Sequence, residues 1–202
     1  MENHSARLLL CSMQLITAYE FVVSGLDKIV SGRFPSGLGM ALMDGASTNP
    51  NQWYIRWLHE TIMPHAVAWG YVIEWGELLV GIGLLLGAAR WLLWPGVAPM
   101  ERQRVAAALT LLTVIVALAG AFMTFNFHLY MGKSPIAVVN PANPFDEGVD
   151  LDLTLTLALL TLATVNALTI RAFNDFVTAR LTRIQRLLPV KQPPVHATVG
   201  KR

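Results

Sequence analysis

The chain has 202 residues, of which 54% are hydrophobic and only 14% charged, too apolar for the surface of a soluble domain of that size. The formal net charge of +2 comes mostly from one C-terminal stretch, so the sequence indicates no nucleic-acid-binding face and no nucleic-acid partner. Its single cysteine, Cys11, excludes an internal disulfide and an iron–sulfur cluster held by this chain alone.

Four apolar segments are long enough to cross a hydrocarbon core about 30 Å thick. They are residues 6–30, 66–89, 105–127 and 151–170. The first is interpreted as a retained span rather than a signal peptide, because the apolar run continues to Val30 without a small-x-small cleavage site. The predicted fold class is an all-α integral membrane protein, a four-transmembrane-helix bundle within residues 1–172.

Basic residues outside the spans predict the orientation, because cytoplasmic flanks retain lysine and arginine. Eleven of the 15 basic residues lie on the side that holds both termini, and four lie on the other side. The four are Lys28, Arg33, Arg56 and Lys133. Both termini are therefore expected in the cytoplasm, and the surrounding lipid bilayer is expected to be a prokaryotic plasma membrane.

The connections on the outer side are long, at residues 31–65 and 128–150. In the first, Trp53 and Trp57 recur at helical spacing and predict a short helix at the membrane interface. In the second, prolines and asparagines between 132 and 148 predict order through turns. After the last span, residues 173–190 read as a cytoplasmic amphipathic helix and residues 191–202 as a disordered tail.

Ionisable residues inside the spans suggest function, since each costs at least about 2.5 kcal/mol to insert. Candidate catalytic carboxylates are Glu74, Glu77 and Glu20. Helical rise places Glu20 and Glu74 at roughly 12 to 15 Å below the outer boundary, where they could face one another. Residues proposed to bind substrate in a polar pocket that opens outward are Lys28, Asp27, Asn126, His128, Arg33 and Arg56.

Two carboxylates at similar depth in a low dielectric should not both be ionised. We therefore expect Glu74 or Glu77 to carry a raised pKa or to pair with Lys28, and such a group suits proton exchange with a quinone. The alternative is that these charges only tie helices together. His59, His65 and His128 match no metal-ligand spacing, so no metal site is predicted.

These residues resemble the DoxX/DoxD family of small four-helix membrane proteins over residues 7–172. The most specific motifs are the G-x-x-K ending of the first span at Gly25 to Lys28 and the E-x-x-x-G-x-G-L-L-x-G run from Glu77 to Gly87. The stretch from Asn126 to Met131, followed by Asn140-Pro141-Ala142-Asn143-Pro144, also looks like the family's exit from the third helix.

The resemblance implies a membrane subunit. For the best-known branch it implies the large subunit of a thiosulfate:quinone oxidoreductase that works with a smaller polypeptide. The motif positions carried onto this chain are Lys28, Glu74 or Glu77, and Asn126.

The first functional hypothesis is thus a quinone-linked oxidoreductase subunit acting on thiosulfate or a related small sulfur anion, with quinone as electron acceptor and a further membrane or extracytoplasmic subunit as partner. Lys28 with Arg33 or Arg56 would attract the anion, and Glu74 or Glu77 would handle the proton. The sequence shows no motif for a protein-bound redox cofactor.

A second hypothesis is a non-catalytic accessory or assembly subunit of a larger complex. A third, a small transporter, lacks the inverted repeat usual for alternating access.

Overall fold

The structure describes residues 4–46, 49–93, 100–133 and 150–187, and side chains within 5–46, 49–93, 104–133 and 150–171. In this computed structural model every regular element of the described part is helical. The order is α1 (His4–Ser31), α2 (Phe34–Ala46), α3 (Gln52–Trp57), a π-helical segment η1 (Leu58–Ile62), a 3-10 turn η2 (Met63–His65), α4 (Ala66–Leu93), α5 (Met100–Tyr130) and α6 (Leu151–Leu187).

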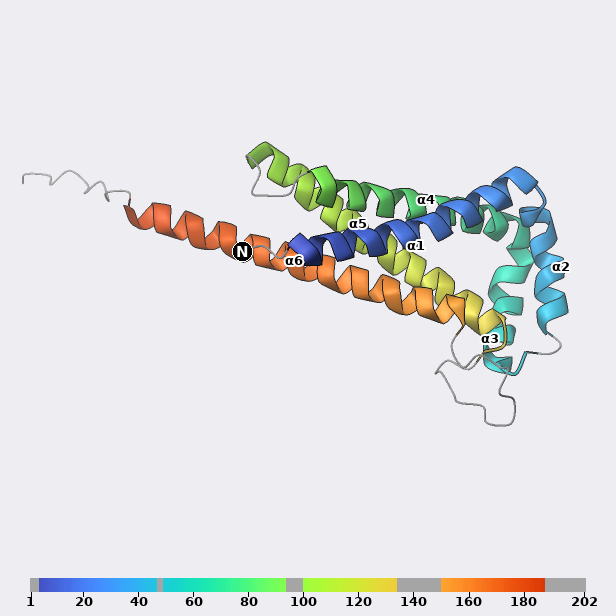
Figure 1. The fold of residues 1–202 in the computed structure, drawn as a ribbon. Coiled ribbons are helices and arrows are strands. Elements are labelled where there is room, and N and C mark those ends of the chain that lie inside the picture. The colour runs from blue at the N-terminus through green and yellow to red at the C-terminus, as the bar shows by residue number, and fades with distance from the viewer. Residues whose placement is uncertain (1–3, 47–48, 94–99, 134–149, 188–202) are drawn as a thin grey trace, which may run out of the picture.

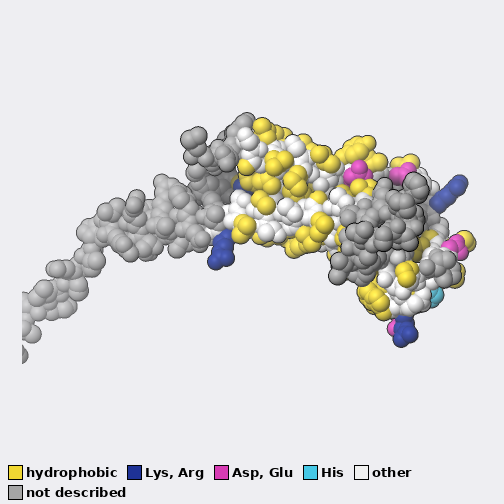
Figure 2. Space-filling view, turned by 60° about the horizontal axis from the view of Figure 1, so that its bottom comes forward, with side chains coloured by type: hydrophobic (Ala, Val, Ile, Leu, Met, Phe, Trp, Pro, Cys, Tyr) yellow, Lys and Arg dark blue, Asp and Glu magenta, His cyan; other side chains and the backbone are white. Residues whose placement is uncertain are grey.

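The predicted multi-pass membrane protein is confirmed at the level of helix length and composition. Four helical stretches are long and apolar enough to cross a bilayer: Ser5–Ser31, Gln52–Leu93, Arg104–Tyr130 and Leu151–Arg171. In Figure 1 the long helices form an elongated bundle. Figure 2 shows apolar side chains over much of its length, with most of the coloured charged groups nearer its ends.

Local chemistry explains where the helices end. Gly32 and Gly132 have φ values of +61° and +75°, the left-handed conformation with which glycine ends a helix, and they follow α1 and α5 closely. Pro64 has no N–H to donate, so the regular hydrogen-bond ladder is interrupted before α4 and passes through π and 3-10 geometry.

Residues 34–46 and 49–65 form a cap at one end of the bundle (Figure 1). The sequence predicted a single short helix there, and α3 confirms a helix at that position. However, the structure adds α2, which the sequence analysis did not predict. Buried apolar side chains join the cap helices to α5: Leu38, Leu42, Tyr54, Ile55, Leu58, Ile62 and Leu129. A membrane-interface position for α3 stays a prediction.

The fourth apolar span, Leu151–Arg171, agrees with the predicted one, but the helix that carries it, α6, continues without a break to Leu187 (Figure 1). The segment expected to form an amphipathic helix at 173–190 is thus helical as far as 187, and its position on a membrane surface stays a prediction. The proline-rich part of the second connection and the tail at 191–202 lie outside the described residues.

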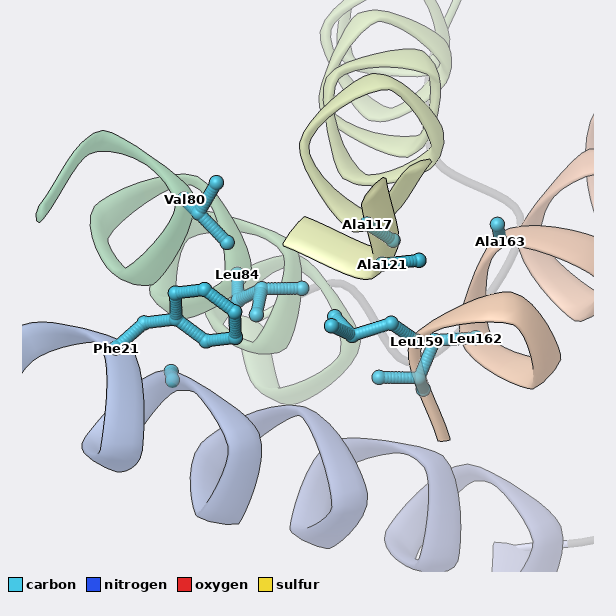
Figure 3. Close-up of a cluster of buried hydrophobic side chains, with 9 residues drawn as sticks. Phe21, Val80, Leu84, Ala117, Ala121, Leu159, Leu162 and Ala163 are labelled. Atoms are coloured by element: carbon cyan, nitrogen blue, oxygen red, sulfur yellow. The ribbon is translucent and has the colours of Figure 1, made fainter. Parts of the chain in front are cut away.

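The centre of the bundle is an apolar layer to which all long helices contribute (Figure 3). We call it the apolar core layer. Its buried members are Ala18, Phe21, Val80, Leu84, Ala117, Ala121, Leu159, Leu162 and Ala163, each at most 4% exposed. Phe21 of α1 and Leu84 of α4 point toward the small alanines of α5 and the leucines of α6 (Figure 3). The buried and apolar members of this layer lie between two regions of the bundle that carry buried polar side chains.

Candidate functional site

Small residues let α1 and α4 approach closely at the apolar core layer and on its cap side. A Cβ added at Gly25 would lie 2.7 Å from the backbone N of Leu78, and one at Gly81 would lie 2.8 Å from the backbone N of Val22. No side chain larger than hydrogen fits at either position without moving the helices apart. Glycine at these points therefore brings the polar faces of the two helices together.

Lys28 and Glu77 meet across this contact. Lys28 Nζ lies 2.7 Å from Glu77 Oε2, and the two side chains are 22% and 3% exposed. Ser24 Oγ donates a hydrogen bond of 3.0 Å to the same carboxylate oxygen and accepts one of 2.6 Å from Lys28. The predicted pairing of Lys28 with Glu74 or Glu77 is confirmed for Glu77, whose buried charge is compensated by a cation and a hydroxyl.

Glu74 lies one helical turn from Glu77, toward the cap, and is 4% exposed. Its Oε2 has no hydrogen-bond partner among the described residues, and a buried carboxyl oxygen without a partner is energetically unfavourable. Glu20 is half-buried on α1. Since Glu74 Oε2 bonds to no described group, the face-to-face placement of Glu20 and Glu74 stays a prediction.

A second polar pair closes the cap side between α5 and α6. His128, which is 2% exposed, places its Nδ1 2.9 Å from both carboxylate oxygens of Asp150. Asp150 Oδ1 also accepts a hydrogen bond of 2.8 Å from the Leu153 N–H and so caps α6. Burial raises the pKa of the Asp150 carboxyl, but these hydrogen bonds and the nearby positive charge of Lys133 outweigh burial and hold the pKa below its ordinary value.

The two pairs belong to one electrostatic cluster. Asp152, in the first turn of α6, is half-buried and interacts electrostatically with Asp150, His128, Glu77 and Lys28. The sequence analysis assigned no site role to Asp150 or Asp152, because carboxylates at a helix start are already explained by the helix dipole. Their sequence positions alone do not reveal that they lie near Lys28 and Glu77.

The remaining predicted site residues lie elsewhere. Asn126 Oδ1 and its backbone oxygen accept hydrogen bonds of 3.2 and 3.0 Å from the Tyr54 hydroxyl, so Asn126 connects α5 to the cap. Asp27, Arg33 and Arg56 have exposed side chains outside the buried cluster.

Sequence reasoning also missed two asparagines that fix the cap. Asn49 Nδ2 donates to the carbonyl oxygens of Leu129 and Tyr130 at 2.9 and 2.8 Å, and Asn51 Nδ2 donates to the Lys133 oxygen at 2.8 Å. These carbonyls are at the C-terminal end of α5, where no intrahelical donor is available. The Asn-Pro-Asn run between two helices signals a turn but does not identify the carbonyls that it binds.

Polar residues flank the apolar core layer on both faces. One helical turn toward the cap, each long helix carries a polar side chain: Ser24, Glu77, Thr124 and Thr156. We call this the cap-side polar layer, and the Thr124 and Thr156 hydroxyls are 2.7 Å apart within it. One turn in the opposite direction lie the polar side chains of Gln14, Thr113 and Asn166, all 0% exposed, which we call the far-side polar layer; α4 contributes the apolar Ala88 at this level.

The cap-side cluster contains more acids than bases. Its carboxyls are Glu74, Glu77, Asp150 and Asp152, and its basic groups are Lys28 and His128, with Lys133 near Asp150. Such an arrangement suits binding and release of protons better than binding of a small anion. Within the part of the chain that the structure describes, no three His, Cys, Asp or Glu side chains are grouped to hold a metal ion.

In comparisons with known proteins, no protein-family model, no curated protein and no solved structure matches this chain. The interpretation of the site therefore rests on its geometry and on the sequence motifs.

Proposed function

We propose that this chain is the membrane subunit of a quinone-linked oxidoreductase, and that the cap-side cluster exchanges protons with the bound quinone. The observation that carries the proposal is the pair of buried glutamates on α4. Glu77 is fixed by Lys28 and Ser24, whereas Glu74 is buried and one of its carboxyl oxygens has no partner among the described residues. A buried carboxyl with an unpartnered oxygen is suited to accept a proton and pass it on when a polar group of a ligand comes within hydrogen-bonding distance.

Quinone reduction needs a group that donates protons. Reduction of a quinone to a quinol takes up two electrons and two protons, and oxidation of two thiosulfate anions to one tetrathionate, with formation of an S–S bond, releases two electrons. Glu74 supplies the two protons to the quinone oxygens in turn and takes up a proton from water at the cap after each transfer, while Ser24 and Lys28 hold Glu77 in place. The quinone is the electron acceptor, and a second subunit delivers the electrons.

The charge of the cluster decides where the sulfur anion is oxidised. Carboxyls outnumber basic groups there, and Lys28 already pairs with Glu77, so Lys28 is not available to bind a small dianion. We place thiosulfate, or a related small sulfur anion, on the partner subunit, near the exposed cations Arg33 and Arg56. This assignment of quinone to the membrane subunit and of the sulfur anion to a second subunit follows the resemblance to the DoxX/DoxD family.

The apolar core layer sets the side from which protons reach the cluster. Its nine buried members carry no hydrogen-bonding side chain, and the buried hydroxyl of Thr17, next to Ala18, donates within its own helix to the Met13 oxygen. Protons therefore exchange with water at the cap. By the distribution of lysine and arginine, this is the outer side of a prokaryotic plasma membrane, with both termini cytoplasmic.

The test is thiosulfate-dependent reduction of a short-chain quinone in native membranes that contain the parent protein or a variant. Glu74→Gln and Lys28→Ala are expected to abolish turnover while the protein remains inserted at parental levels. Glu60→Gln, at an exposed carboxyl of the cap, is the matched control and should keep the parental rate. If both cluster variants turned over at the parental rate, the cluster would have no role in the reaction.

An accessory or assembly role is the second candidate. It is favoured by the Lys28–Glu77 pair itself, which joins α1 to α4 whether or not a quinone binds. Purification from native membranes distinguishes the two roles. An accessory subunit is recovered in stoichiometric complex with its partners, and the complex keeps its activity when Glu74 is replaced by glutamine.

A further inference from the structure

Two arginines from different helices meet at the end of the bundle opposite the cap. Arg7 of α1 donates a hydrogen bond of 2.7 Å from Nη2 to the carbonyl oxygen of Trp91 in α4. The guanidinium carbon of Arg90 lies 4.3 Å from the centroid of the Trp91 ring. Trp91 thus positions both cations, and the two like charges interact with each other.

Among the residues that the structure describes, two hydrogen-bond donors at this place are buried without an acceptor. Arg90 Nη1 and Trp91 Nε1 have no hydrogen-bond partner among the described residues. A buried donor left unsatisfied costs about 1–3 kcal/mol, and more when it is charged. Moreover, every carboxylate with a described side chain lies in the cap or in the cap-side half of its helix: Glu20, Asp27, Asp44, Glu60, Glu74, Glu77, Asp150 and Asp152.

The helix dipole explains part of this arrangement. The C-terminal end of α4 carries partial negative charge, which favours cations at Arg7 and Arg90. The dipole does not, however, supply an acceptor for Arg90 Nη1 or for the Trp91 indole N–H. An external group with several acceptor oxygens and a negative charge would satisfy both donors.

We propose that Arg7, Arg90 and Trp91 form a binding site for the phosphate group of an anionic membrane lipid. A guanidinium offers a planar set of donors that matches phosphate oxygens, and indole N–H groups favour the headgroup level of a bilayer. The ends of spanning helices lie at that level. An anionic lipid is preferred over a zwitterionic one because a choline group would return a positive charge to a site that already holds two cations.

The experiment measures retention of phosphatidylglycerol and of phosphatidylcholine by the detergent-solubilised full chain, using native mass spectrometry. Arg90→Gln is the test variant. Arg171→Gln is the matched control, because Arg171 is exposed and lies toward the same end of the bundle on α6. A third measurement adds inorganic phosphate, which shares the phosphate chemistry but has no acyl chains.

The parent and Arg171→Gln are expected to retain phosphatidylglycerol in preference to phosphatidylcholine, and Arg90→Gln should bind it about tenfold more weakly. Arg7→Gln should show the same loss and serves as a second variant if Arg90→Gln does not fold. Equal phosphatidylglycerol retention in the arginine-site variants and in Arg171→Gln would overturn the site. Displacement of the lipid by equimolar inorganic phosphate would overturn the assignment to a lipid and indicate a soluble phosphate instead.

Discussion

Lys28 Nζ and Glu77 Oε2 lie 2.7 Å apart, and this pair joins α1 to α4 immediately on the cap side of the apolar core layer. The glutamate is almost wholly buried, so removal of its partner leaves a charge that neither water nor another cation compensates. The stability of the bundle and the chemistry of the cluster therefore depend on the same contact.

Lys28→Met is expected to lower the free energy of unfolding by about 3 kcal/mol. This value is at the lower end of the range for breaking a buried ion pair, because Lys28 is partly exposed. Unfolding by sodium dodecyl sulfate in mixed micelles measures the change, with exposed Arg33→Gln as the control. The double variant Lys28→Met with Glu77→Gln should recover part of the loss. A loss in Lys28→Met no larger than that in the control would show that the pair does not stabilise the bundle.

Gly25→Ala should destabilise the protein by about 1–3 kcal/mol, because the added methyl group would meet the backbone of Leu78 and push α1 away from α4. Gly37→Ala is the matched control. A Cβ at Gly37 meets nothing within 4 Å, and alanine favours a helix more than glycine does, so this change should be neutral or mildly stabilising. Similar effects of the two substitutions would contradict the close approach of α1 and α4.

Stability should fall at acid pH partly through Asp150. Its pKa in the folded protein lies below the ordinary value of about 3.9, so its contribution to stability is complete above about pH 4 and is lost as the pH falls through the folded pKa. Thermal unfolding of the parent and of Asp150→Asn between about pH 3 and 6 checks this. The advantage of the parent should shrink at the acid end. An advantage that grows on acidification would contradict the assigned shift.

Gln14→Leu should leave the unfolding midpoint unchanged or raise it. Gln14 is 0% exposed in the far-side polar layer, and neither its Nε2 nor its Oε1 has a hydrogen-bond partner among the described residues. Replacing an unsatisfied buried amide by an apolar group of similar size removes a desolvation penalty. Circular dichroism on heating gives the midpoint. A lower midpoint would mean that Gln14 makes a hydrogen bond in the membrane.

The spans and the Lys28–Glu77 pair could be predicted because both follow from local patterns. A run of about 20 apolar residues has few alternatives to a transmembrane helix, and a charge within it needs a partner at similar depth. The same reasoning could not choose between Glu74 and Glu77. They are one turn apart on α4, and the choice depends on how the Gly25 and Gly81 contacts rotate α1 against α4.

The cap was harder to predict because its structure depends on tertiary contacts. Residues 34–46 contain Pro35 and several glycines, which are typical of a loop, yet they form α2 because Leu38 and Leu42 are buried against Tyr54 and its neighbours. The proximity of Asp152 to Lys28 depends likewise on the packing of α6. Because α6 begins 120 residues after α1 ends, local sequence patterns cannot reveal this contact.

A change in the protonation of Glu74 on quinone reduction can be detected by infrared difference spectroscopy of the protein with a bound short-chain quinone. A carboxyl signal on reduction should be present in the parent and in Glu60→Gln and absent in Glu74→Gln. The same carboxyl signal in all three proteins, or no signal in the parent although quinone is bound and reduced, would contradict proton exchange by Glu74.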